Sequence, residues 1–292
     1  MYDDVLLPTD GSPGAEAAIV RALDLARTGE STLHTLHVVD TGPEPPGLGD
    51  DDRAVLRDAA ERRGRRATAL AEERADELGL RTVREVREGD PYREILEYVG
   101  EVGVDLVVMG THGRDRGERS RLGSTAERVV ALADVPVLTV QLEADAEAPR
   151  SGYGMYDHVV VATDGSDAAE RAADHGLAIA ERYGADVHVV YTVDTAVYEL
   201  SDSERSIVGL LEQGGENAVE TVAAAARDRN LPVETHVLRG GPERTLMEYA
   251  DGLDADLLTL GTRGLAGVGE RFLGSTTRRV LGRANRPVLT AR

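Results

Sequence analysis

Short β-rich apolar runs alternate with longer helix-like stretches along the whole chain. These runs predict five strands in each half. In the first half they lie near residues 3–8, 31–39, 81–87, 104–109 and 136–140. In the second half they lie near residues 157–162, 186–193, 233–238, 256–260 and 287–291, with a long helix around 204–229. Strands separated by helices are typical of parallel sheets with helical crossovers, so the pattern predicts an α/β fold.

The first helix has a clear start. Ser12 followed by Pro13 is typical of an N-cap with proline at the first helical position. Small apolar residues then fall on one face, namely Ala15, Ala18, Ile19, Ala22 and Ala26. The apolar runs 104–109 and 255–260 predict central strands that helices cover on both faces.

The two halves of the chain repeat each other. Residues 5–12 (VLLPTDGS) recur as residues 159–166 (VVVATDGS), at an offset of 154. Nearer the end of each half the offset is 151, so the second copy is shorter by 154 − 151 = 3 residues. We expect two domains, residues 1–142 and 156–292, joined by an acidic, turn-rich linker at 143–155.

A three-glycine pattern with identical spacing occurs once in each half, after a predicted strand and before a predicted helix. Its members are Gly110, Gly113 and Gly123 with Ser124 and Thr125, and Gly261, Gly264 and Gly274 with Ser275 and Thr276. Glycine lets the backbone approach a ligand closely, and a helix N-terminus offers free N–H groups to an anion. The pattern therefore predicts two phosphate-binding loops.

The loops after strands one and four carry the candidate chemistry. If these strands are neighbours at the point where strand order reverses, one cleft receives both loops. Asp10 could then bind a ribose or base while the glycine loop holds phosphates. Both loops are net positive, with five Arg against three acids in residues 111–128 and four against one in 262–279. Arg114, Arg263 and Arg271 are the candidate phosphate neighbours.

Structural alternatives exist for each of these motifs. Ser124 and Glu127 fit an ordinary capping box. In the second half the corresponding residue is Arg278, whose charge opposes the helix dipole unless an anion is present. Asp10 and Asp164 could instead use their side chains to hold an Asp-Gly turn.

Together these motifs resemble the universal stress protein family, over nearly all of both halves. Nucleotide-binding members of that family carry Gly-x2-Gly-x9-Gly-Ser/Thr, so the resemblance implies the ATP-binding subclass. It also implies two Rossmann-like, adenine-nucleotide-hydrolase-like domains, each an open five-stranded parallel sheet of order 3-2-1-4-5. Pairing of the fifth strands would make the chain an intramolecular pseudo-dimer, and a further homodimer stays open.

The resemblance and the motifs together nominate the site residues. In the first half they are Pro8, Thr9, Asp10, Val38, Met109, Gly110, Gly113, Arg114, Gly123, Ser124 and Thr125. In the second half they are Ala162, Thr163, Asp164, Thr192, Leu260, Gly261, Arg263, Gly264, Gly274, Ser275 and Thr276. Thr192 stands where the first half has Val38, so we expect the two sites to differ.

The expected ligand is ATP, or AMP or ADP, with Mg²⁺ entering through the nucleotide's own phosphates. The chain has no lysine, which excludes a phosphate loop ending in Gly-Lys-Ser/Thr. Phosphoryl transfer needs a cation and a positioned base, and no convincing base appears. We therefore favour a regulatory or stress-response module without efficient turnover and assign no catalytic residue. A slow Mg-dependent ATPase and an interaction protein with vestigial sites stay open.

The net charge is −20, from 53 acidic residues and 33 basic residues that are all arginine. This composition resembles that of halophilic, for example haloarchaeal, proteins, while a GC-rich genome is the alternative. The acidic surface argues against nucleic-acid binding. The basic cluster of Arg62, Arg63, Arg65 and Arg66 is expected to be a solvated helix face.

The remaining sequence features mainly exclude functions. No membrane span or signal peptide is indicated, so a cytoplasmic protein is expected. Zero cysteines exclude disulfides and thiolate chemistry. The seven histidines are not expected to form a metal site, since His34 and His37 point to opposite faces of one strand. His112 is expected to be a polar loop residue.

Overall fold

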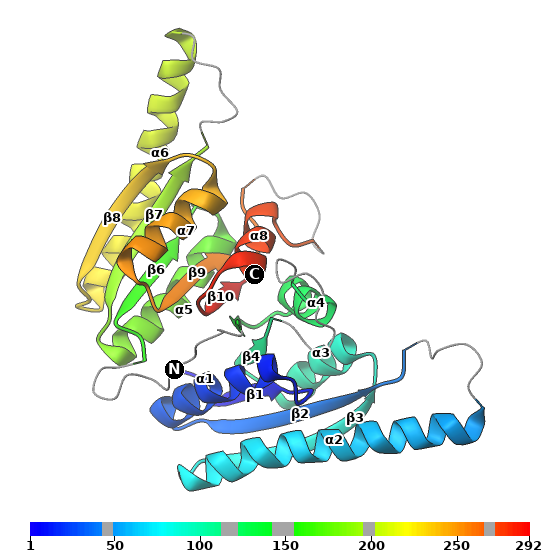
Figure 1. Cartoon of the computed structure of the whole chain (residues 1–292). Helices are drawn as coiled ribbons and strands as arrows, with labels where there is room; N and C mark the ends of the chain where they lie inside the picture. The colour runs from blue at the N-terminus through cyan, green and yellow to red at the C-terminus, as the bar shows by residue number, and fades with distance from the viewer. Residues whose placement is uncertain (43–48, 112–121, 142–154, 195–201, 266–271) are drawn as a thin grey trace. The chain divides into compact units, whose positions relative to one another are not determined.

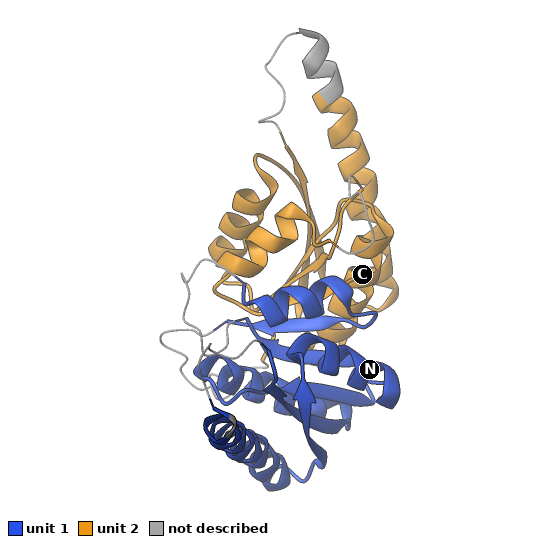
Figure 2. Cartoon of the chain, turned by 90° about the vertical axis from the view of Figure 1, so that its right-hand side faces the viewer, with its two compact units in different colours: residues 1–146 blue, residues 147–292 orange. Residues whose placement is uncertain are grey.

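A computed structural model describes residues 1–42, 49–111, 122–141, 155–194, 202–265 and 272–292 of the chain. The chain divides into two compact units, residues 1–146 and residues 147–292, coloured separately in Figure 2. No helix among the described residues is both long and apolar enough to cross a membrane.

Unit 1 alternates strands and helices throughout. Its elements are β1 (Asp4–Pro8), α1 (Pro13–Gly29), β2 (Thr32–Asp40), α2 (Asp50–Glu77), β3 (Arg81–Gly89), α3 (Pro91–Val102), β4 (Leu106–Gly110), α4 (Ser124–Leu132) and β5 (Val137–Val140). The strands pair in parallel in the order β3-β2-β1-β4-β5. The order reverses direction between β1 and β4, which is where open parallel sheets bind ligands.

Unit 2 repeats this arrangement. Its elements are β6 (His158–Ala162), α5 (Asp167–Tyr183), β7 (Asp186–Val193), α6 (Asp202–Asp228), β8 (Val233–Arg239), α7 (Pro242–Leu253), β9 (Leu257–Gly261), α8 (Ser275–Arg283) and β10 (Val288–Ala291). The parallel strands follow the order β8-β7-β6-β9-β10, so β6 and β9 flank its switch point.

Helices cover both faces of each sheet, as Figure 1 shows for α2 and α3 on β2. Two histidines of β2 point to opposite faces of the sheet. His34 Nδ1 lies 2.9 Å from the hydroxyl of Tyr98 on α3. His37 faces α2, where a Cβ on Gly64 would come within 2.0 Å of its Cδ2. The prediction that these histidines point to opposite faces is confirmed.

The local sequence signals explain where the elements begin. Ser12 caps α1, accepting from the Ala15 N–H at 3.3 Å, and Pro13 opens the helix. The apolar face predicted for this helix is buried. Strands β4 and β9 are almost wholly buried, because both of their faces are covered.

Candidate functional site

The loops that follow β1 and β6 have the same local structure. Ser12 N–H donates to Asp10 Oδ1 at 2.9 Å, and Ser166 N–H donates to Asp164 Oδ1 at 3.1 Å. Gly11 sits between Asp10 and Ser12 with φ of 72°, a left-handed conformation that glycine adopts without strain. The turn contact expected as the structural alternative for both aspartates is therefore present, and it engages only one oxygen of each carboxylate.

The first glycine of each loop is required by packing. A Cβ on Gly110 would lie 2.6 Å from the backbone oxygen of Gly14 in α1, and one on Gly261 would lie 2.8 Å from the backbone nitrogen of Ala169 in α5. Backbone atoms cannot move aside as a flexible side chain can. Gly110 and Gly261 thus let the end of the fourth strand of each unit touch the first turn of its neighbouring helix.

The third glycine closes each loop just before a helix starts. Gly123 N–H donates to Thr111 O at 2.8 Å, and Gly274 N–H donates to Thr262 O at 2.9 Å. The next residues, Ser124 and Ser275, are the first residues of α4 and α8, and no described side chain caps either helix. The first three N–H groups of each helix have no acceptor within it and carry the positive end of the helix dipole.

The capping box expected as the alternative in unit 1 is wrong. Gly123 occupies the cap, so Ser124 is already helical and cannot serve as the N-cap partner of Glu127. The two helix starts differ in charge. The first turn of α4 contains Glu127, whereas that of α8 contains no acid and has the exposed Arg278 at the equivalent position. On this count unit 2 offers an anion the more favourable helix end.

In unit 2 the two site loops are bonded to each other directly. Leu265 N–H donates to Asp164 Oδ2 at 2.9 Å, and Ser166 Oγ donates to Arg263 O at 3.4 Å. A Cβ on Gly264 would come within 2.3 Å of Asp164 Oδ2. The second glycine of the pattern therefore admits the aspartate of the neighbouring strand's loop, as the predicted convergence of the two loops requires.

Unit 1 has a pocket of about 290 Å³ beside Asp10. It lies between the β1–α1 loop and helices α1 and α2. Its lining residues are Thr9, Asp10, Gly11, Glu16, Ile19, Arg63, Arg66, Ala67 and Leu70. Apolar walls with a few charged groups are typical of sites that bind small polar molecules.

The prediction that the four arginines of α2 form a solvated helix face holds for two of them and is wrong for the other two. Arg62 pairs with Asp58 at 2.8 Å and Arg65 pairs with Glu61 at 2.5 Å, both on exposed helix surface. Arg63 and Arg66 instead line the pocket next to Asp10. Helical geometry explains the split, because residues three apart lie on one face and their neighbours turn away.

The corresponding positions of α6 carry no charge. Ala67 lies nearest the Cβ position of Gly11 at 3.3 Å, and Ala218 lies nearest that of Gly165 at 3.6 Å, which fixes the alignment of the two helices. By this alignment the second unit has Gly214 and Asn217 where the first has Arg63 and Arg66. The two candidate sites thus differ in the charge beside their aspartates.

Sequence reasoning missed a pair of side chains beneath the aspartate loops. His37 Nδ1 donates to Thr9 O at 2.7 Å, which supports the loop from below. Tyr191 occupies the equivalent position in β7. Burial raises the pKa of Tyr191, and the nearby Asp164 carboxylate raises it further. A polar aromatic residue at the same strand position in both repeats was the available signal.

Not every nominated residue lies at the pocket. Val38 does not line it, because strand alternation turns its side chain to the face opposite His37. Thr192 alternates in the same way with Tyr191. Six nominated residues lie within the strands that end at the site, and they are Pro8, Met109, Gly110, Ala162, Leu260 and Gly261. Gly113, Arg114, Arg271 and His112 lie outside the described residues.

Comparison with known proteins gives the family. The model of the universal stress protein family matches residues 1–141 and again residues 155–292. The chain belongs to the universal stress protein family. Both repeats are universal stress protein domains, so the chain is a tandem member.

Relatives and solved structures agree with this assignment. The chain is 34% identical over 146 residues to a universal stress protein of Methanocaldococcus jannaschii, covering 49% of this chain and 86% of that protein. An alignment of 298 positions gives 28% identity to one of Mycobacterium tuberculosis, covering 99% and 96% of the two chains. The crystal structure of a universal stress protein from Archaeoglobus fulgidus shares the fold, with a TM-score of 0.71, 21% identity and coverage of 99% and 96%.

Proposed function

We propose that this tandem universal stress protein binds an adenine nucleotide, ATP in the first place, in each of its domains. The observation that carries the proposal is the meeting of two loops at the switch point of a parallel sheet. In unit 2, Asp164 from the β6 loop lies at hydrogen-bond distance from Leu265 of the glycine loop. Helix α8 begins nearby, and the N–H groups of its first turn have no acceptor within the helix.

The pocket of unit 1 suits the nucleoside part of such a ligand. At about 290 Å³ it lies near the lower end of the range for ligand pockets, about 300–1,000 Å³. Ile19 and Leu70 provide apolar contact for a base, and Asp10 provides an acceptor for hydroxyl or amino groups. The phosphates would extend from the pocket towards the start of α4.

The phosphate end is supported by backbone and arginine. The amides of Ser124 and Thr125, and those of Ser275 and Thr276, are donors at a positive helix end. Arg263 belongs to the glycine loop of unit 2, so we assign it to phosphate contact. Mg²⁺ would come with the nucleotide, held chiefly by its phosphates.

We place the function in binding and regulation rather than turnover. A bound nucleotide would stabilise both strand-end loops in one arrangement that a partner recognises. The net charge of −20 and the absence of lysine support the proposal that the protein works in a cytoplasm with a high salt concentration. The pseudo-dimer through the fifth strands and any further homodimer stay predictions.

Thermal unfolding with and without Mg-ATP tests the proposal. A ligand at 100 times its Kd stabilises the folded state by about 2.7 kcal/mol, so the melting temperature should rise measurably. Mg-GTP serves as the control for nonspecific phosphate binding, and high-salt buffer keeps the acidic chain folded. A melting temperature that stays constant at saturating Mg-ATP would contradict nucleotide binding. Phosphate release measured in the same samples decides the slow ATPase alternative.

A further inference from the structure

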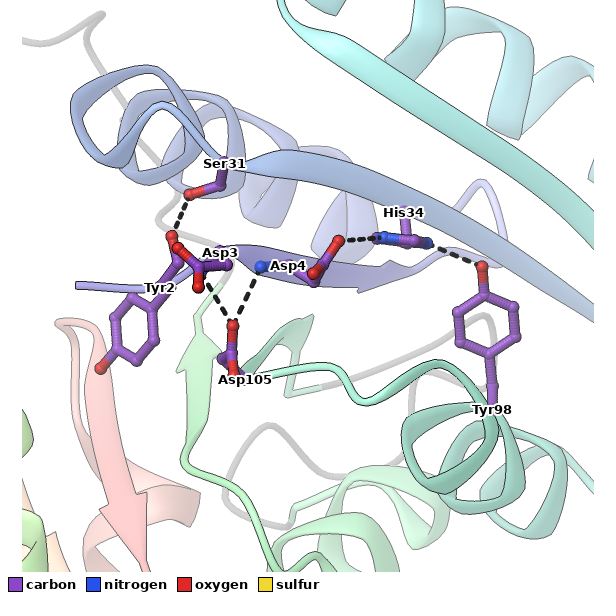
Figure 3. A network of polar contacts seen from close by, with 7 residues as sticks. All are labelled: Tyr2, Asp3, Asp4, Ser31, His34, Tyr98 and Asp105. Atoms are coloured by element: carbon purple, nitrogen blue, oxygen red, sulfur yellow. Dashed lines mark hydrogen bonds and ion pairs between the residues drawn. The ribbon is translucent and has the colours of Figure 1, made fainter.

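The α3 face of unit 1 holds a complete hydrogen-bond chain. Figure 3 shows His34 between Asp4 and Tyr98. His34 Nε2 lies 2.8 Å from Asp4 Oδ1, and Nδ1 lies 2.9 Å from the Tyr98 hydroxyl. Because a carboxylate only accepts, Nε2–H donates to Asp4 and the phenol donates to Nδ1. Both ring nitrogens are therefore satisfied.

The positive charge of Arg87, on the neighbouring strand β3, is neutralised by nearby carboxylates in unit 1. Arg87 of β3 donates to Glu85 at 2.6 Å and to Glu101 at 2.6 Å. Its guanidinium lies 4.8 Å from the centre of the Tyr98 ring. Asp4, Glu85 and Glu101 thus each have a cation or an N–H donor beside them.

Unit 2 keeps the histidine and tyrosine but changes their surroundings. His188 and Tyr249 repeat the contact, with Nδ1 and hydroxyl 3.0 Å apart. At the other equivalent positions His158 replaces Asp4, Glu234 replaces Val83, His236 replaces Glu85 and Leu238 replaces Arg87. The substitutions remove the acceptor carboxylate and the balancing arginine, and they add two imidazoles and a new carboxylate.

The strand register brings these new groups to one face. His188 pairs with Glu234 on β8, and His236 lies two residues further along β8. His158 of β6 lies two residues before Val160, the partner of His188. Since alternate residues of a strand share a face, all four side chains point towards the same side of the sheet as Tyr249 of α7.

The resulting cluster has the composition and spacing of a metal site. One ligand atom from each of His188, Glu234 and His236 lies within 4.8 Å of the other two. Glu234 Oε2 is 3.5 Å from His236 Nε2 and 3.9 Å from His188 Nδ1. The rings of His188 and His236 are stacked, with centroids 6.1 Å apart and an interplanar angle of 15°.

Two nitrogens in the cluster are buried without a hydrogen bond. His158 Nδ1 and His236 Nε2 are both inaccessible and make no hydrogen bond among the described residues, although the Glu234 carboxylate lies 3.5 Å from His236 Nε2. Leaving a buried polar group unsatisfied costs about 1–3 kcal/mol, so such groups call for a ligand. Among the described residues of unit 1, His34 is the imidazole at this face, and both of its nitrogens have bonding partners.

We propose that His188, Glu234 and His236 bind a divalent transition-metal ion of the zinc class. Two imidazoles and one carboxylate are a common donor set for Zn²⁺, and imidazole excludes Mg²⁺ and Ca²⁺ as preferred ions. The three ligands leave a position for water or for His158, which lies beside His188 with ring centroids 5.9 Å apart.

Only small movements separate the present arrangement from coordination. Ligand atoms about 2.1 Å from a tetrahedral ion lie about 3.4 Å apart. The Glu234–His236 distance of 3.5 Å is close to this value, and Glu234 is an exposed side chain that can move towards His188. Coordination through His188 Nδ1 would replace its contact with the Tyr249 hydroxyl. A bound ion would join β7 to β8 and stabilise unit 2.

Zinc titration of the full chain tests the proposal. Metal is first removed with a chelator, and excess Mg²⁺ is present to occupy exposed carboxylates of the acidic surface. We expect one Zn²⁺ per chain by calorimetry and a higher melting temperature with Zn²⁺. Co²⁺ in place of Zn²⁺ should give the intense visible absorption of a four-coordinate site.

The variants use the residues of unit 1 as replacements. Glu234→Val with His236→Glu should weaken Zn²⁺ binding by more than about tenfold and abolish the shift in melting temperature. Glu234→Gln keeps the side-chain shape and should also weaken binding. His34→Gln alters the equivalent histidine of unit 1 and should leave the Zn²⁺ titration unchanged. Equal Zn²⁺ titrations for wild type and the Glu234 variants would overturn the proposal.

Discussion

The backbone N–H of Leu265 donates to Asp164 Oδ2 across 2.9 Å, joining the loops that follow β9 and β6. The other oxygen of Asp164 accepts from Ser166 at 3.1 Å within its own turn. The aspartate is thus oriented from both sides before any ligand contacts it. A side chain held in this way loses little conformational freedom on binding, which favours affinity.

Gly264→Ala should weaken nucleotide binding in unit 2 by about tenfold. The new Cβ would lie 2.3 Å from Asp164 Oδ2, so the carboxylate must turn away and lose the Leu265 bond. A hydrogen bond to a charged group contributes about 1.5–3 kcal/mol, and 1.4 kcal/mol corresponds to tenfold in Kd. Calorimetric titration with Mg-ATP measures the effect. Gly252→Ala is the matched control, since its Cβ meets nothing within 4 Å.

Asp10→Ala and Asp164→Ala should expose two unequal nucleotide sites. Unit 1 has Arg63 and Arg66 beside Asp10, whereas unit 2 has Gly214 and Asn217 at the equivalent positions. The site left in Asp164→Ala should therefore lose more affinity as salt rises than the site left in Asp10→Ala. Titrations of both variants at two salt concentrations measure this. Superimposable curves would refute the difference.

Gly110→Ala should destabilise unit 1 by about 1–3 kcal/mol, the usual cost of overpacking. Its Cβ would be placed 2.6 Å from the backbone oxygen of Gly14, which is fixed in α1. Denaturant unfolding followed by circular dichroism measures the loss. Gly100→Ala in α3 meets no atom within 4 Å and should be neutral or stabilising. Equal stability of the two variants would contradict the steric role of Gly110.

The stability of the chain should depend on the protonation of His175 in α5. Burial is the largest cause of its lowered pKa, with Arg229 adding to it and Asp174 opposing it. Below pH 6.5 the unfolded chain binds a proton that the folded chain resists, so the free energy of unfolding falls as pH falls. His175→Gln removes this contribution. The difference in melting temperature between variant and wild type should change below pH 6.5 in favour of the variant, and a constant difference would contradict the assignment.

Much of the fold followed from local sequence because the signals were redundant. Each strand lies within two residues of its predicted range, since apolar runs, Gly and Pro boundaries and the internal repeat agree. The start of α1 at Ser12 and Pro13 was predicted from capping chemistry alone. The Ser124 capping box failed because the preceding Gly123 can itself adopt the extended cap conformation.

Side-chain convergence across strands was harder to predict. His188 and His236 lie on neighbouring strands but 48 residues apart in the chain, so the histidine spacing that excluded a metal site on one strand carried no information about the next. Arg63 and Arg66 likewise became pocket residues only once α2 was docked against α1. In both cases the missing information was the register between elements.

The steric role of Gly110 and Gly261 has a consequence for sorting relatives into ligand-binding and ligand-free groups. A glycine required by helix–strand contact should persist in homologues that no longer bind a ligand. Its presence therefore indicates the fold and not ligand binding. Gly264, which is exposed and faces a carboxylate across the switch point, is free to drift once selection for binding ends. Replacement of this glycine in a homologue should therefore indicate the loss of ligand binding before any change at the first glycine does.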